Sequence, residues 1–179
     1  TAGGLTATYD YYDGGWLKSI AYTGGTTIQL TYNDNGFLTG MTDGAGNTVY
    51  GRDEVGRLLS RTDPFGNQVG YHYDAIGRLD VLTYPGSKTV GYTYDAAHRM
   101  KTVSSWLGTM ATYNYNAAGQ LSTILNGNNT NTTFGYQTTT GRLDGITHKK
   151  SDNTVIASYQ FILDGNGNRE SSSLIQPLL

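Results

Sequence analysis

Apolar and polar residues alternate over short stretches of the chain, and each stretch is followed by turn-forming residues. In residues 69–73, apolar or aromatic residues alternate with small or polar ones, the period-two pattern of a half-buried β-strand. Residues 74–77 favour a tight turn, because aspartate accepts backbone hydrogen bonds and glycine adopts positive φ. A second strand is predicted from Leu79 to about Tyr84, and residues 85–88 would then turn the chain again. The pattern predicts a β-hairpin, and no stretch shows helical periodicity of comparable length.

This hairpin recurs along the chain with a period of about 21 residues. Its clearest copies read YHYDAIGRL at 71–79, YTYDAAHRM at 92–100 and YNYNAAGQL at 113–121. Self-similarity at a fixed period indicates one supersecondary unit packed beside copies of itself. The second aromatic position of each copy serves as the anchor of the repeat. Successive anchors are separated by 21, 20, 21, 21, 21, 21 and 27 residues, and they are Tyr11, Tyr32, Arg52, Tyr73, Tyr94, Tyr115, Tyr136 and Leu163.

Two further positions recur after the anchor. A glycine stands two residues before a leucine or methionine in nearly every copy, and His98 is the sole substitution for it. We therefore predict one array of about eight repeats over residues 1–172, followed by an off-pattern tail at 173–179 that could plug an end or reach the next unit. The structural repeat positions are Tyr11, Tyr32, Tyr73, Asp74, Gly77, Arg78, Leu79, Tyr94, Asp95, Tyr115, Gly119, Leu121, Tyr136, Gly141 and Leu143.

The predicted fold class is all-β: antiparallel hairpins that form a curled or spiral strip. Sixteen strands would make a sheet about 75 Å wide, too wide to stay flat. Equivalent tyrosines should lie in rows, with their rings in contact and their hydroxyls reaching water or neighbouring backbone. Arg52 interrupts this row, and its guanidinium is expected to stack on a neighbouring ring. Because open strand edges recruit other strands, the expected partners are further repeats or copies of the chain itself.

The motif Tyr-Asp-x-x-Gly-Arg-Leu at residues 73–79 resembles the YD repeat of the RHS (rearrangement hotspot) family. The connecting segments at 42–47 and 62–67 resemble those of the family, and residues 164–169 resemble its Asp-x-x-Gly-Asn-Arg variant. The resemblance extends over residues 5–170 and implies a strip of hairpins that spirals into a hollow shell.

In bacterial polymorphic toxins, insecticidal toxin complexes and wall-associated proteins of this family, the shell encloses or displays a C-terminal toxin. In the more distant teneurins, a related shell serves cell adhesion. Eight hairpins are too few to close a container, and the sequence shows no C-terminal RHS core segment with its self-cleavage site. Enclosure would therefore need further repeats or other copies of the chain.

Composition narrows the function classes. The net charge of −2 gives no electrostatic footprint for nucleic acid or anionic lipid. The absence of cysteine excludes disulfides and thiol catalysis, and no apolar run reaches the length of a membrane span. Because the sequence begins at Thr1 without a methionine or a signal peptide, we expect a processed product, an excised piece or an incomplete read.

Several candidate chemical sites favour a structural interpretation. Residues 63–66 resemble the aspartate motif of RHS self-cleavage, but they occupy an ordinary inter-repeat turn without a second carboxylate. Residues 164–168 carry oxygen ligands at alternate positions, yet Arg169 and Ile175 stand where a calcium loop needs glycine and glutamate. The three histidines, His72, His98 and His148, lie at no metal-ligand spacing. We predict no catalytic residue, no metal and no cofactor.

Two surface features remain as candidates. Asn128 and Asn131 begin glycosylation sequons within one connecting turn. Trp16 and Trp106, together with the tyrosines, could form a platform on which sugars stack.

The sequence therefore predicts a structural, non-enzymatic repeat module of a secreted or cell-surface protein, part of a β-shell that encloses or displays a toxin. The alternative is a self-assembling extracellular fibre or adhesin whose role is mechanical or glycan-binding. A downstream variable domain would favour the first function, and more repeats or a wall anchor would favour the second.

Overall fold

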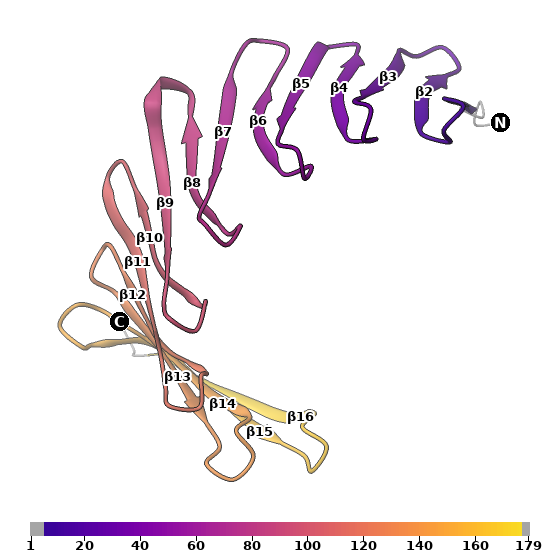
Figure 1. Ribbon diagram of the computed structural model, residues 1–179. Coiled ribbons are helices and arrows are strands. Elements are labelled where there is room, and N and C mark those ends of the chain that lie inside the picture. The colour runs from indigo at the N-terminus through magenta and orange to yellow at the C-terminus, as the bar shows by residue number, and fades with distance from the viewer. Residues whose placement is uncertain (1–5, 177–179) are drawn as a thin grey trace. The chain divides into compact units, whose positions relative to one another are not determined.

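The computed structural model of the protein describes residues 6–176 (Figure 1). This part of the chain is all-β, with one 3₁₀ turn, η1 (Pro85–Ser87), and the predicted fold class is confirmed. The strands are β1 (Ala7–Tyr11), β2 (Leu17–Tyr22), β3 (Thr27–Tyr32), β4 (Leu38–Asp43), β5 (Gly46–Arg52), β6 (Leu58–Thr62), β7 (Gln68–Tyr73), β8 (Leu79–Tyr84), β9 (Lys88–Tyr94), β10 (Met100–Ser105), β11 (Gly108–Tyr115), β12 (Leu121–Asn126), β13 (Asn131–Tyr136), β14 (Leu143–Lys149), β15 (Val155–Leu163) and β16 (Arg169–Ile175).

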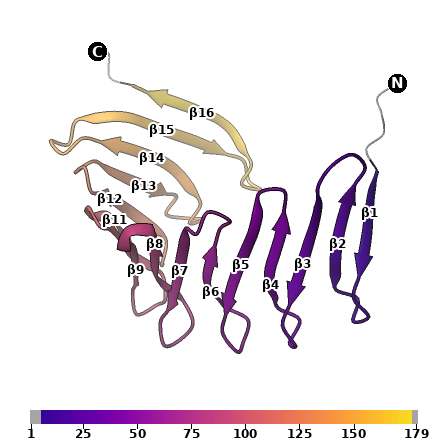
Figure 2. The same ribbon diagram turned by 90° about the horizontal axis from the view of Figure 1, so that it is seen from above.

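The chain forms two compact units, Thr1–Thr89 and Val90–Leu179. In the first unit, β1 to β8 lie side by side in chain order, and each pairs antiparallel with the next, as Figure 2 shows. In the second unit, β9 to β16 follow the same rule. Each unit is therefore built by adding one hairpin after another.

A β-bulge marks the turn end of the hairpins. In the hairpin of β7 and β8, Tyr73 pairs with Leu79, and the register shifts between His72 and Tyr73. A bulge adds one residue to one strand, which increases the local twist and re-aims the side chains beside the turn. The other anchors pair in the same way: Tyr11 with Leu17, Tyr32 with Leu38, Arg52 with Leu58, Tyr94 with Met100, Tyr115 with Leu121, Tyr136 with Leu143 and Leu163 with Arg169.

Few side chains are buried in this fold. Among residues 6–176, the buried apolar side chains are Ala111 and Ala157, and the buried polar ones are Thr48 and Thr132. Strands expose side chains on both faces, and most large apolar residues are only half-buried. Contacts along the sheet, rather than a core beneath it, must therefore hold consecutive hairpins together.

The predicted C-terminal tail begins inside a strand. β16 runs to Ile175, so residues 173–175 pair with β15 instead of leaving the sheet. Leu174 and Ile175 are exposed by 50% and 62% on this strand. Residues 177–179 lie outside the described part of the chain.

Two turn glycines differ in whether an added side chain would meet a steric clash as well as backbone strain. Gly66 and Gly56 have φ of 82° and 86°, where a residue with a Cβ is strained by about 1–2 kcal/mol. An added Cβ at Gly66 would meet nothing within 4 Å, whereas one at Gly56 would lie 2.5 Å from the Phe37 ring. We expect Gly66→Ala to lower the free energy of unfolding by the strain alone and Gly56→Ala to lower it further, both measured by urea denaturation. Equal losses would show that the Phe37 contact is unimportant.

Candidate functional site

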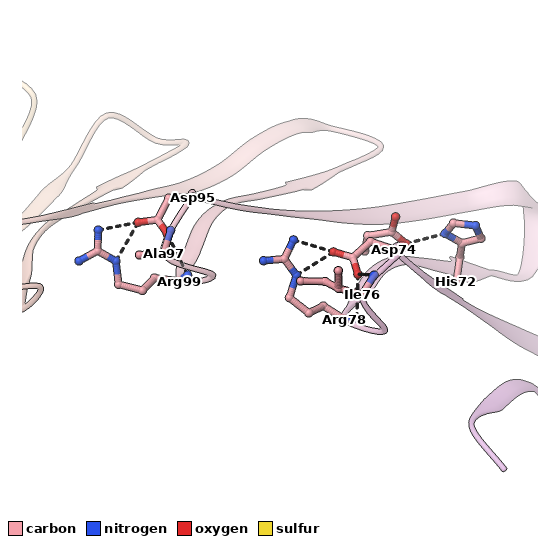
Figure 3. A network of polar contacts seen from close by, with 8 residues as sticks. His72, Asp74, Ile76, Arg78, Asp95, Ala97 and Arg99 are labelled. Atoms are coloured by element: carbon pink, nitrogen blue, oxygen red, sulfur yellow. Dashed lines mark hydrogen bonds and ion pairs between the residues drawn. The ribbon is translucent and has the colours of Figure 1, made fainter. Parts of the chain in front are cut away.

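The recurring turn after each anchor is organised by one carboxylate. In the first unit, Asp74 Oδ1 accepts hydrogen bonds from the backbone N–H of Ile76 at 3.0 Å and of Arg78 at 2.9 Å (Figure 3). The backbone closes the same turn, because the N–H of Gly77 donates to the Asp74 carbonyl at 2.9 Å. An aspartate that satisfies two turn amides explains why this residue type follows the anchor.

The second carboxylate oxygen holds an arginine. Asp74 Oδ2 accepts from Arg78 Nε at 2.7 Å, and Asp95 Oδ2 accepts from Arg99 Nε at 2.8 Å in the corresponding turn of the second unit (Figure 3). Asp53 and Arg57 form the same pair at 2.6 Å. The backbone N–H of Arg78 is the main cause that lowers the pKa of Asp74, and the Arg99 side chain is the main cause at Asp95. The position of the guanidinium is thus fixed by the aspartate of its own turn.

The held arginine then reaches the next hairpin. The guanidinium of Arg57 lies 5.0 Å from the centre of the Tyr73 ring, and that of Arg99 lies 4.1 Å from the Tyr115 ring. Both distances are typical of cation–π contacts. We call the residue immediately before the recurring leucine or methionine the turn-bridging residue, because it joins its own turn to the following hairpin.

Other turn-bridging residues make the same connection with different chemistry. Gln120 Nε2 donates to the Gly141 carbonyl at 2.5 Å, and Arg142 Nη1 donates to the carbonyls of Asp164 and Gly165 at 3.2 and 3.1 Å. In the first hairpin this position is Trp16, whose ring lies 5.7 Å from the ring of Tyr32. The residue at this position therefore contacts the following hairpin in each case, although its side chain differs.

The anchor tyrosines make a second connection between hairpins. The hydroxyl of Tyr73 donates to the Leu58 carbonyl at 2.9 Å, and those of Tyr115 and Tyr136 donate to Met100 and Leu121 at 2.8 Å. Arg52 replaces a tyrosine in this series, and its Nε donates to the corresponding carbonyl of Leu38 at 2.7 Å. The guanidinium was expected to stack on a ring; it instead takes over the hydrogen bond of the missing hydroxyl.

The structure thus changes the predicted role of the tyrosine row. The hydroxyls contact neighbouring backbone, as expected, but the ring faces of Tyr73 and Tyr115 contact guanidinium groups where other tyrosines were expected. Sequence reasoning named Arg78 as a repeat position but missed the contact that Arg57 and Arg99 make with the following tyrosine ring. The available signal was the aspartate four residues before the arginine in three turns.

The aspartates weighed as chemical sites cap turns in the same manner. Asp63 Oδ1 accepts from the N–H of Phe65 and of Asn67, both at 2.9 Å, while Oδ2 accepts from Asn67 Nδ2 at 3.0 Å. Asp164 makes the equivalent bonds to Asn166 and Asn168. Both segments lie in turns, and their carboxylates accept hydrogen bonds from turn donors.

The three histidines have different local settings. His72 Nδ1 contacts Asp80 Oδ1 at 2.6 Å, and His148 Nδ1 contacts Thr132 Oγ1 at 2.9 Å. His98 occupies the turn-glycine position with φ of 63°. Within residues 6–176, no three histidine, aspartate or glutamate side chains gather closely enough to hold a metal ion.

The remaining predicted sites lie on turns and strands. Asn128 Oδ1 accepts from the Thr130 N–H and hydroxyl, and Asn131 begins β13. Trp106 is half exposed between β10 and β11. Gly77, Gly119 and Gly141 all have positive φ, as the turn requires.

The contact between Arg99 and Tyr115 can be measured by a double-mutant cycle. Arg99→Ala and Tyr115→Leu should show a coupling energy of about 0.5–1 kcal/mol, because each variant removes one partner of the cation–π contact. Tyr115→Phe keeps the ring and loses only the hydrogen bond to Met100, so it should cost about 0.5–1.5 kcal/mol. Its coupling to Arg99→Ala should be close to zero. Equal coupling with Leu and Phe would contradict the ring contact.

Acid should weaken these turns with a definite sign. Hydrogen bonds from the side chains of Asn67 and Asn168 are the main causes that lower the pKa of Asp63 and Asp164 below their usual value of 3.8. A depressed folded-state pKa contributes stability that is complete above 3.8 and is lost as the pH falls through the folded pKa. Asp63→Asn/Asp164→Asn should therefore make the loss of unfolding free energy below about pH 4 shallower. Asp34→Asn/Glu54→Gln changes the net charge equally without removing a turn cap, and it should retain the steeper loss.

The matches to known proteins agree with this geometry. Residues 52–89 match the family model described as RHS Repeat. No curated protein matches the sequence significantly. The chain also shares its fold with larger solved structures, of which it spans about a tenth of the length.

One such structure is a Photorhabdus luminescens Tc holotoxin pore, with 21% identity, a TM-score of 0.78, and coverage of 100% of this chain and 11% of that chain. TcdB2-TccC3 gives 20% identity and a TM-score of 0.77 over 100% of this chain and 11% of that one. TcdB2-TccC3 without its hypervariable C-terminal region gives 23% identity and a TM-score of 0.77, over 96% and 10%. The resemblance to the RHS/YD-repeat family is confirmed: residues 52–89 match its repeat model, and the whole chain shares the fold of these structures.

Proposed function

We propose that this repeat module is part of the wall of a β-shell that encloses or displays a toxin, in a secreted or cell-surface protein. The observation that carries the proposal is the one-way connection between hairpins. Arg57, Arg99 and Gln120 each reach from their own turn to the following hairpin, so the same kind of contact can join one hairpin to the next. Such a connection builds an extended wall rather than a closed pocket.

The two terminal strands support a place within a longer wall. Among the described strands, β1 pairs only with β2 and β16 only with β15. Every residue of both strands is exposed. An open edge presents backbone groups that pair with another strand. The proposed partners are further RHS repeats or other copies of this chain, with a toxin domain on one side of the wall.

An enzymatic role is not proposed. The candidate carboxylates Asp63 and Asp164 are bound by turn amides, and this arrangement serves the fold without presenting a reactive group. No helix within residues 6–176 is long and apolar enough to cross a membrane. The proposed location outside the cell rests on the family resemblance.

The alternative is a self-assembling extracellular fibre or adhesin. The same exposed edges favour it, because identical chains could join end to end through β1 and β16. Exposed Trp16 and Trp106 would supply a surface for glycans in that case.

Electron microscopy of the native particle that carries this chain separates the two functions. We expect a closed hollow body whose toxin domain resists protease until the shell is opened by denaturant. A filament with an axial repeat of the size of this chain would overturn the shell and favour the fibre. A small open monomer with no protected domain would contradict both assemblies.

A further inference from the structure

The turns of the first two hairpins line an open cavity of about 470 Å³. Three aromatic rings line it. Trp16 lies over Tyr32 with an angle of 33° between the rings, and Tyr12 meets Tyr32 edge-on at 6.2 Å. The remaining lining includes Asp13, Asn33 and Asp34. An aromatic cavity with two carboxylates is a site for a positively charged group.

The comparison with other hairpins shows what is missing here. Tyr73 and Tyr115 are each covered by an arginine, Arg57 and Arg99, and a carboxylate holds that arginine. Over Tyr32 the turn-bridging residue is Trp16, which carries no charge. The first two hairpins therefore retain aromatic rings and carboxylates, while the turn-bridging residue over Tyr32 carries no charge.

The carboxylates of this cavity are not used by the turns. In the first two turns, the residue that follows the anchor is Tyr12 or Asn33, and the aspartate stands one position later. Asn33 Oδ1 accepts the turn amides of Asn35 and Phe37, at 3.2 and 2.9 Å, the role that aspartate has elsewhere. Asp13 and Asp34 are exposed at the cavity and cap no turn.

Lys18 contacts one of the lining rings but pairs with a different carboxylate. Its Nζ lies 3.0 Å from Asp10 Oδ2 and 5.9 Å from the centre of the Tyr12 ring. Asp13 contributes only a longer-range attraction to Lys18. The cavity is consequently negative and lined by rings whose faces attract cations.

We propose that this cavity binds an organic cation, either a guanidinium or an alkylammonium group. The rings of Tyr12, Trp16 and Tyr32 would contact its apolar and cationic surface, and Asp13 and Asp34 would neutralise its charge. The group would come from a small soluble cation or from an arginine or lysine side chain of another protein. This inference goes beyond the proposed shell function and requires no enclosed toxin.

Tryptophan fluorescence tests the site in the intact chain. Trp16 and Trp106 are the two tryptophans, so Trp106→Phe leaves Trp16 as the sole reporter. We would titrate this variant with choline, with N-acetyl-arginine amide, with an arginine-containing peptide and with neutral N-acetylglucosamine. We expect saturable changes with the cations that weaken as salt rises from about 0.05 to 0.5 M. Preference for choline would indicate a soluble cation, and preference for the peptide would indicate a protein side chain.

Matched variants assign the binding to this cavity. Asp13→Asn/Asp34→Asn should weaken cation binding by about tenfold or more. Glu54→Gln removes a carboxylate at the equivalent turn position of the third hairpin, where Arg57 is present, and should leave binding unchanged. Trp16→Arg should place a guanidinium of the chain in the cavity and abolish binding of the added cation. Binding to this variant would be measured by NMR, from the ring resonances of Tyr32.

Three results would overturn the proposal. They are the absence of any cation-dependent change, an equal loss in Glu54→Gln, and a response to N-acetylglucosamine alone that is insensitive to salt. The last result would identify a saccharide site instead. Thermal unfolding of each variant would show that the compared chains are folded.

Discussion

The array depends on a side chain that is held by its own turn and placed on the next hairpin. A two-stranded hairpin is marginally stable alone, and a sheet normally gains stability by burying one face. Here the described chain buries only Ala111, Ala157, Thr48 and Thr132. The contact from Arg99 to Tyr115, with Asp95 behind the arginine, acts instead along the sheet. It needs no second layer, which is why consecutive hairpins can form a sheet with little buried core.

The variations among hairpins show that direction matters more than charge. Arginine, glutamine and tryptophan all serve as turn-bridging residues, through a ring contact, an amide hydrogen bond or an aromatic contact. Each of them approaches the turn glycine of the following hairpin. A Cβ at Gly77 would lie 3.2 Å from Arg57 Nη1, and one at Gly36 would lie 2.7 Å from the Trp16 ring. The glycine therefore provides positive φ and also space for its neighbour.

Much of this fold could be predicted from the sequence, because period-two strands and glycine turns are local signals. The strand of Leu79–Tyr84 and the anchor at Leu163 both appear as predicted. The contacts across hairpins could not be predicted in the same way. The predicted contact between tyrosine rings rested on the equal spacing of equivalent residues. In the structure, the ring of Tyr73 instead contacts Arg57, which lies 16 residues earlier in the sequence. That pairing depends on the bulge beside the anchor, which re-aims the side chains and leaves no pattern in composition.

The same reasoning explains why the cavity at the first two hairpins was not visible in the sequence. Trp16 could be recognised as an exposed aromatic residue, but its position over Tyr32 follows only once the turn-bridging geometry is known. The presence of tryptophan where other hairpins have arginine can then be interpreted structurally, which composition alone does not allow. With Trp16 at the turn-bridging position, no arginine from that position lies over Tyr32. Two carboxylates, Asp13 and Asp34, have no role in the turn. The described strands expose side chains on both faces of the sheet, so a carboxylate that no turn uses can serve an external partner. Arg57 and Arg99 join their turns to the following hairpins by the same contact. Where Trp16 takes this position, the changed contact leaves a surface that can bind a cation.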